Sequence, residues 1–177
     1  MKTVNVGIIG YGKVAHLHAR ALQSIDSANL VAVYGRDLAK AQQFAGQYNL
    51  RAYTDLEEMI KQSGVQAIVV CTPHPAHASS AVVAANLGVH VLVEKPLAAS
   101  LEDCDKMIDA ARRNGVLLGV ISQRRFYEPV LRVRQAIDEG KIGTPILGSV
   151  IMYGWRDEKY YRSDPWRGKW ETEGGGV

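Results

Sequence analysis

Residues 10–15, Gly-Tyr-Gly-Lys-Val-Ala, have the spacing of a loop that binds a diphosphate. Gly10 permits a tight turn, and Gly12 lets the backbone approach a pyrophosphate, whose charge the loop amides and the next helix would bind. Ala15 takes the third small position, where the helix packs on the strand. The loop follows an apolar run and opens a helical pattern, which predicts dinucleotide binding. The predicted cofactor-binding residues of this loop are Gly10, Tyr11, Gly12, Lys13, Val14 and Ala15.

The choice between NAD and NADP depends on the residues that end the second apolar run, Gly35, Arg36 and Asp37. An acidic residue at this position would accept the 2′-hydroxyl bonds of NAD, whereas a small residue followed by arginine admits the 2′-phosphate of NADP. Gly35 and Arg36 therefore favour NADP, with NAD as the other candidate cofactor. The alternative interpretation is that Asp37 caps the next helix and Arg36 is a solvated turn residue.

Polar or charged side chains, each group with a proline, also follow two later apolar runs. They are Thr72, Pro73 and His77 after residues 67–71, and Glu94, Lys95 and Pro96 after residues 89–93. In doubly wound sheets, ligands bind outside the carboxyl ends of the strands. We therefore expect all six residues to line the same edge of the sheet as the glycine loop and to contact the cofactor.

The elements that would position these residues alternate between strand and helix. Five apolar runs rich in β-branched residues span residues 4–9, 30–34, 67–71, 89–93 and 116–121. Helical patterns begin near Lys13, Leu38, Leu56, Pro75 and Leu101. Near-continuous apolar strands separated by helices indicate a parallel sheet covered on both faces. Residues 1–122 are therefore predicted to form a doubly wound α/β domain.

Composition narrows the class of protein. A hydrophobic fraction of 47% with 22% charged residues is typical of a soluble globular protein. No segment approaches the ~20 consecutive apolar residues of a membrane span, and the N-terminus has no signal-peptide pattern. We therefore expect a cytoplasmic protein without a membrane partner.

Neither nucleic acid nor metal is an expected partner. A formal net charge of +3 is too small to indicate nucleic acid, and neither a helix-turn-helix nor a basic extension is present. Cys71, His74 and His77 recur at three-residue spacing, but Pro73 and Pro75 interrupt any shared helical face. We therefore predict no metal site.

Taken together, the motifs resemble the Gfo/Idh/MocA oxidoreductases, named for glucose-fructose oxidoreductase and inositol dehydrogenase. The resemblance covers the whole chain. Its pieces are the loop at 10–15, Cys71-Thr72-Pro73 with His77, Glu94-Lys95-Pro96, Gln123-Arg124-Arg125-Phe126 and Gly140-Lys141-Ile142-Gly143. It implies a Rossmann domain and hydride transfer between a nicotinamide and a secondary alcohol or ketone of a sugar, cyclitol or nucleotide sugar.

The resemblance also implies roles for individual residues. Lys95 would be catalytic, lying between nicotinamide and substrate and hydrogen-bonding the reacting oxygen, with Glu94 orienting it. An ammonium suits this role because it stabilises negative charge that develops on oxygen. Lys95, Arg125, Trp166 and Arg167 are the predicted substrate-binding residues, since guanidinium and indole groups bind hydroxyl-rich or anionic ligands. Aromatic packing is the alternative for residues 160–170.

Residues 123–177 are predicted to be the incomplete start of an α+β domain for substrate binding and oligomerisation. They contain a predicted helix at 128–139 and a strand at 146–152. In the family a histidine and an aspartate follow the triple glycine, but this chain ends at Val177 and has Glu173 before the glycines. We therefore expect cofactor binding without turnover, and a homo-oligomer in the full-length form. The alternative hypothesis is a non-catalytic dinucleotide-binding sensor or interaction module.

Overall fold

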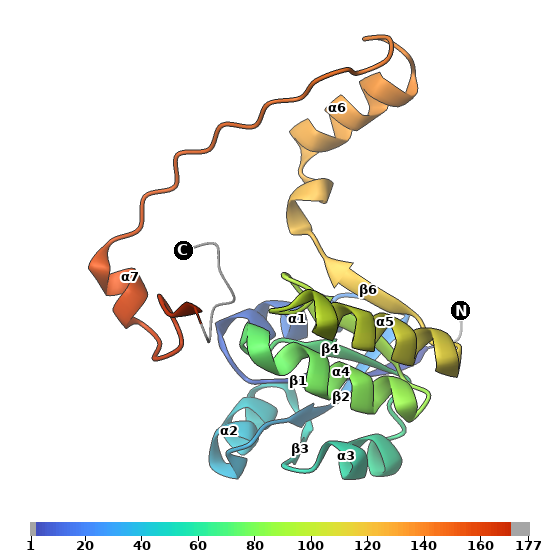
Figure 1. Cartoon of the computed structure of the whole chain (residues 1–177). Helices are drawn as coiled ribbons and strands as arrows, with labels where there is room; N and C mark the ends of the chain where they lie inside the picture. Colours follow the sequence, from blue (N-terminus) through green and yellow to red (C-terminus); the bar gives the residue numbers. More distant parts are fainter. Residues whose placement is uncertain (1–2, 171–177) are drawn as a thin grey trace. The chain divides into compact units, whose positions relative to one another are not determined.

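The computed structural model describes residues 3–170 (Figure 1). These residues divide into two compact units, one formed by residues 3–121 with 168–170 and the other by Ser122–Arg167. Residues 171–177, which hold Glu173 and the triple glycine, lie outside the described part of the chain. No helix within residues 3–170 has the combined length and apolar character that crossing a membrane requires.

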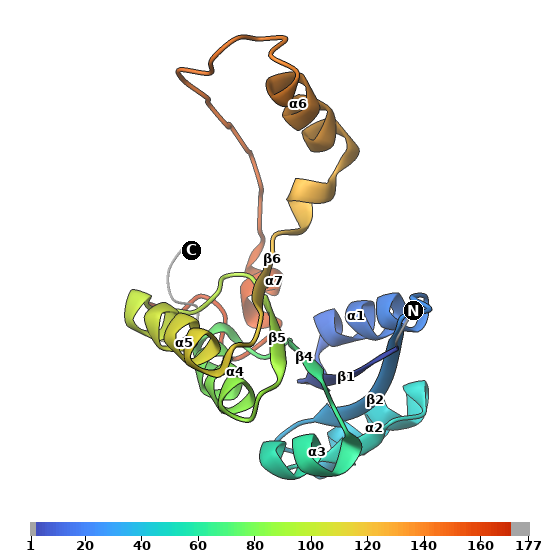
Figure 2. The ribbon, with the colours of Figure 1, turned by 90° about the vertical axis from the view of Figure 1, so that its right-hand side faces the viewer.

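The first unit is built on a six-stranded parallel sheet of order β3-β2-β1-β4-β5-β6 (Figure 2). Its strands are β1 Val4–Ile9, β2 Ala28–Tyr34, β3 Arg51–Tyr53, β4 Ala67–Val70, β5 His90–Glu94 and β6 Leu118–Ile121. The strand order reverses between β1 and β4, which pair directly. A doubly wound sheet opens a crevice at this point, beyond the carboxyl ends of the strands. The predicted fold class is confirmed.

Helices cover both faces of the sheet. They are α1 Lys13–Gln23, α2 Leu38–Tyr48, α3 Leu56–Ser63, α4 His77–Asn86 and α5 Leu101–Asn114. One core gathers buried side chains of α1 and α2 against β1 and β2, and the other gathers those of α3, α4 and α5. Alanines such as Ala15, Ala19 and Ala81 are almost fully buried, so these helices approach the strands closely. This rigid frame fixes the loops at the strand ends.

The expected helix starts agree with the structure except at α4. Asp55 and Ser100 cap α3 and α5 by accepting from the backbone N–H groups of Glu58 and Asp103, at 2.8 and 3.2 Å. The helix expected near Pro75 begins at His77, after the short 3₁₀ turn His74–Ala76. Strand β3 was not expected, because three residues of mixed polarity carry no periodic signal.

The second unit contains the turn Gln123–Phe126, α6 Glu128–Asp138 and α7 Glu158–Arg162. The predicted helix at 128–139 is confirmed. The predicted strand at 146–152 is wrong: these residues have no strand hydrogen bonding, and Ile146 and Val150 are 98% and 95% exposed. The physical reason is that a strand needs a partner strand for its backbone groups, and the described part of this unit contains no other strand.

Candidate functional site

The glycine loop joins β1 to α1 at the carboxyl edge of the sheet. Gly10 has a positive φ of 100°, and a Cβ at this position would lie 3.0 Å from the carbonyl oxygen of Cys71. Its N–H donates to Tyr34 O at 2.8 Å, which holds the turn against β2. Only glycine therefore fits this turn without strain.

Space and charge at the start of α1 suit an anion. A Cβ added to Gly12 would meet no atom within 4 Å, so the backbone stays open to a ligand. Gly12 is also the N-cap of α1, where no side chain caps the helix and the first turn holds no acidic residue. By contrast, α2, α3 and α5 are capped by the side chains of Asp37, Asp55 and Ser100. The uncapped amides of α1 fit a pyrophosphate.

The end of β2 presents Gly35, Arg36 and Asp37. Gly35 is buried, and a Cβ built on it would run into the ring of Tyr11. Asp37 caps α2, because its Oδ1 accepts from the N–H of Lys40 at 3.1 Å. Arg36 is exposed. The structure therefore bears out the capping role of Asp37, while the role of Arg36 toward a 2′-phosphate stays a prediction.

The loop after β4 holds Cys71 and Thr72 beside the glycine loop, since the N–H of Cys71 donates to Ile9 O at 2.8 Å. Burial raises the pKa of the Cys71 thiol, and the negative charge of Glu94 raises it further. The sulfur therefore stays protonated and is no nucleophile. Thr72 Oγ1 is buried and has no hydrogen-bond partner among the described residues. A buried hydroxyl without a partner suits a hydrogen bond to a polar atom of a ligand.

His77 connects two of the loops at this edge. Its ring is fully buried, and Nδ1 and Nε2 lie 2.9 Å from Pro96 O and 2.8 Å from Thr72 O. The ring thus spans the loop after β4 and the loop after β5. Its predicted contact with a cofactor stays a prediction, but the ring supports two loops that carry other predicted site residues.

Glu94 is the last residue of β5, and His18 of α1 binds it. His18 Nε2 lies 2.8 Å from Glu94 Oε1, and Glu94 Oε2 accepts from the backbone N–H of Lys95 at 3.2 Å. Burial would raise the pKa of Glu94, but the hydrogen bond and charge of His18, helped by Lys95, hold the pKa below its ordinary value. Glu94 is therefore an anchored carboxylate at neutral pH.

Sequence reasoning missed His18, for which no role in the site was predicted. One signal was available: His18 follows Ala15 by three positions and precedes Ala19, and both alanines face the sheet. Lys95, next to Glu94, is exposed, and its side chain forms no ion pair with any described carboxylate. Its ammonium is thus available to a ligand at the edge that carries the glycine loop.

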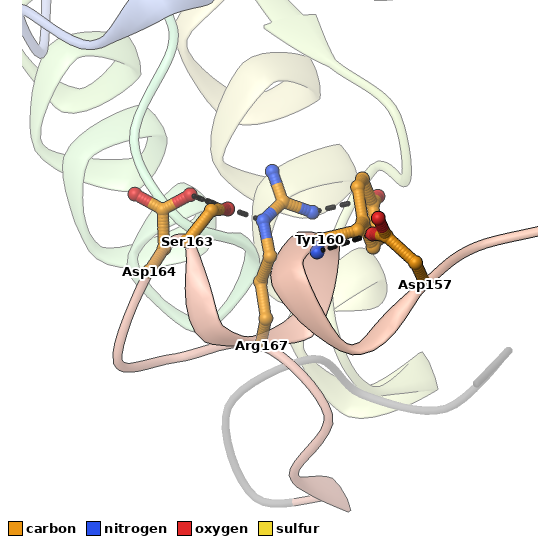
Figure 3. Close-up of polar contacts among 5 residues, drawn as sticks. All are labelled: Asp157, Tyr160, Ser163, Asp164 and Arg167. Carbon is orange, nitrogen blue, oxygen red and sulfur yellow. Dashed lines mark hydrogen bonds and ion pairs between the residues drawn. The ribbon is translucent and has the colours of Figure 1, made fainter.

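Three of the four predicted substrate-binding residues, Arg125, Trp166 and Arg167, lie in the second unit, whereas Lys95 lies in the first. Arg167 donates from Nε to Asp164 Oδ2 at 3.1 Å and from Nη1 to the Tyr160 hydroxyl at 2.7 Å (Figure 3). Its guanidinium carbon lies 4.5 Å from the ring centroids of Tyr160 and Trp166. Trp166 and Arg167 therefore come together, whereas Arg125 is exposed on the turn that precedes α6.

Comparison with known proteins identifies the family. The model of the GFO_IDH_MocA family, described as an oxidoreductase family with an NAD-binding Rossmann fold, matches residues 4–122. A 1-carboxy-3-chloro-3,4-dihydroxycyclo hexa-1,5-diene dehydrogenase of Comamonas testosteroni is 36% identical over 141 residues, which are 79% of this chain and 36% of that protein. An inositol 2-dehydrogenase of Salmonella paratyphi B is 32% identical over 149 residues, covering 82% of this chain and 44% of the relative.

A solved structure gives the same result. The WlbA dehydrogenase of Bordetella pertussis, crystallised with NADH and UDP-GlcNAcA, has a TM-score of 0.90 and 31% identity, covering 98% of this chain and 52% of that one. The chain thus spans about half, or less, of the length of these relatives. The glycine loop, the polar strand ends and these matches lead to one conclusion: the chain belongs to the Gfo/Idh/MocA family of oxidoreductases with an NAD-binding Rossmann fold.

Proposed function

We propose that this chain binds NAD(P) at the carboxyl edge of its sheet and serves the interconversion of a secondary alcohol and a ketone on a sugar, cyclitol or nucleotide sugar. The observation that carries the proposal is the pair at the end of β5. Glu94 is held by His18, and Lys95 beside it is exposed on the edge that also carries the uncapped start of α1.

The residues at this edge fit a dinucleotide. The open backbone at Gly12 and the first-turn amides of α1 would hold the pyrophosphate. Thr72 Oγ1, which has no hydrogen-bond partner among the described residues, offers a hydrogen-bonding group at the same edge of the sheet. When bound, the nicotinamide supplies the two-electron acceptor or donor of the reaction.

Lys95 would act on the substrate oxygen. Its ammonium would donate a hydrogen bond to that oxygen and stabilise the negative charge that develops there in either direction of the reaction. Glu94 contacts the backbone N–H of Lys95 and not its ammonium, so Glu94 and His18 would fix the start of the loop from which the lysine extends. Pro96 follows in the same loop, where His77 binds its carbonyl oxygen.

The coenzyme we favour is NADP. Gly35 followed by the exposed Arg36 fits a 2′-phosphate, and Asp37 is already committed to capping α2. NAD remains the alternative coenzyme, because related structures hold NADH or NAD.

Residues 123–177 would belong to the substrate and oligomerisation domain of the whole protein. Arg125, Trp166 and Arg167 are the residues we propose for contact with hydroxyl-rich or anionic substrate groups. Support comes from relatives whose names point to inositol and from a related structure with UDP-GlcNAcA.

Titration of the purified chain with NADPH and NADH, followed by nicotinamide fluorescence, is the first test. We expect saturable binding of at least one dinucleotide, and binding of neither would contradict the proposal. Oxidation of inositols or nucleotide sugars is then measured by formation of the reduced nicotinamide. Lys95→Ala should lower any such turnover by about 10²-fold or more, whereas Lys61→Ala, on the exposed face of α3, should not. Binding without turnover in any form of the protein would favour the sensor alternative.

A further inference from the structure

The ring of Tyr11 takes the space in which a side chain at Gly35 would lie. Tyr11 comes from the glycine loop and Gly35 from the end of β2, and a Cβ on Gly35 would run into two atoms of the ring. The backbone of Gly35 has no positive φ, so the ring of Tyr11, and not the local conformation, excludes a Cβ at this position. The two positions are a matched pair.

The ring is not free to move away without cost. Tyr11 packs against the core formed by α1, α2 and the strands beneath them. Gly35 is itself fixed, because it is buried and its N–H donates to Tyr53 O at 3.0 Å. Displacing the ring would therefore give up apolar burial, and moving β2 would break a strand contact.

The contact between Tyr11 and Gly35 determines which charged side chains can lie near the ribose of a bound dinucleotide. The residue at position 35 is where an acidic side chain would accept the hydrogen bonds of an unphosphorylated ribose. The nearby carboxylates are committed elsewhere: Asp37 caps α2, and Asp55, after β3, caps α3. Arg36, directly after Gly35, is an exposed cation.

We infer that Tyr11 restricts which residue can stand at position 35: by occupying the space beside Gly35, its ring excludes an acidic side chain there and leaves Arg36 to select a dinucleotide with a 2′-phosphate. The inference rests on the proposed function, because it concerns the same dinucleotide site. It predicts that NAD preference cannot be introduced at position 35 alone, and that removing the ring makes the change possible.

The test measures dissociation constants for NADPH and NADH, and melting temperatures, in four variants and the unmodified chain. The unmodified chain should bind NADPH at least about tenfold more tightly than NADH. Gly35→Asp should lower the melting temperature and weaken the binding of both dinucleotides. Tyr11→Ala combined with Gly35→Asp should regain melting temperature relative to Gly35→Asp and bind NADH more tightly than NADPH. Tyr11→Ala alone should keep the NADPH preference, since Arg36 is unchanged.

Gly46→Asp is the matched control, because it adds the same carboxylate on α2 at a position where a Cβ meets nothing within 4 Å. It should keep the coenzyme ratio of the unmodified chain. The inference is overturned if Gly35→Asp has the melting temperature and the dissociation constants of the unmodified chain. It is also overturned if the double variant has neither a higher melting temperature nor a higher affinity for NADH than Gly35→Asp. Equal affinity of the unmodified chain for both dinucleotides would also overturn it. Binding of neither would instead refute the proposed function.

Discussion

Two opposite effects act on the pKa of Glu94, at the carboxyl edge of the sheet. Its position at the end of β5 removes much of its hydration, which disfavours the charge. The contact with His18 and the N–H of Lys95 outweighs that cost, so the carboxylate is ionised and fixed. The same charge adds to the effect of burial, which is the larger cause, in raising the pKa of the neighbouring Cys71 thiol.

Glu94→Gln tests this balance through the pH dependence of stability. The pKa of Glu94 is lower in the folded chain than the ordinary value of 4.5, so its contribution is present above pH 4.5 and lost as pH falls through the folded pKa. At pH 7 the variant should be less stable by about 1–2 kcal/mol, and the difference should shrink as the pH falls below 4.5. Urea unfolding at several pH values measures this.

The control for that experiment is Glu57→Gln, which removes an exposed carboxylate paired with Lys61 within α3. It should change stability by under about 1 kcal/mol. A Glu94→Gln chain whose stability deficit stays constant from pH 7 to pH 3 would show that the ionised carboxylate adds nothing.

His77→Ala tests the buried bridge between two loops. The change leaves the carbonyl oxygens of Thr72 and Pro96 without the ring and opens a cavity, so we expect a loss of about 2–4 kcal/mol. His90→Ala removes an exposed ring that accepts one hydrogen bond, from the N–H of Leu117, and should cost about 1 kcal/mol or less. Equal effects in thermal or urea unfolding would argue against the bridge.

At the scale of elements, the two glycines in the connection from β1 to α1, Gly10 and Gly12, have different roles. Gly10 is needed by the backbone, because φ is positive and the neighbouring strand is close. Gly12 has an ordinary backbone and open space around it, so its lack of a side chain serves access to the helix amides. The two positions of one motif therefore respond differently to the same substitution.

Gly10→Ala and Gly12→Ala make that difference measurable. Gly10→Ala should lower stability by about 1–3 kcal/mol, because alanine is strained at this φ and presses on Cys71. Gly12→Ala should change stability by under about 0.5 kcal/mol and still weaken dinucleotide binding by about tenfold. Denaturant unfolding and fluorescence titration report the two effects separately. Loss of stability in both variants would contradict this division.

At the scale of the whole chain, the two units differ in how they are stabilised. The first has a core on each face of its sheet. The second has no buried side chain in α6, and residues 144–157 form no helix or strand. Apolar side chains there are largely exposed, for example Leu147 at 88% and Trp155 at 82%. The stability of the chain therefore rests on the first unit.

Limited proteolysis should follow this difference. We expect the first cuts of a broad-specificity protease within residues 144–157, because exposed backbone without secondary structure enters a protease site readily. Residues 3–121 should persist, and longer still with a bound dinucleotide. Mass spectrometry of the fragments identifies the sites. Early cuts inside the sheet would contradict the stability assigned to the first unit.

Local patterns in the sequence determined the fold class, most strand and helix positions, and the polar residues at the strand ends. They suffice because periodicity, caps and turn residues act over a few positions, as at Asp55 and Ser100. They were wrong for residues 146–152, since an extended pattern forms a strand only where a partner strand exists.

Only the tertiary structure decided which side chains meet. His18 reaches Glu94 across 76 positions of the chain, and the ring of Tyr11 lies where a side chain at Gly35 would project. The spacing of residues in α1 indicates which of its side chains face the sheet, but it does not tell which distant residue each of them contacts. Contacts between distant residues depend on the order of the strands and the faces that helices cover, so they emerge only when the chain is folded.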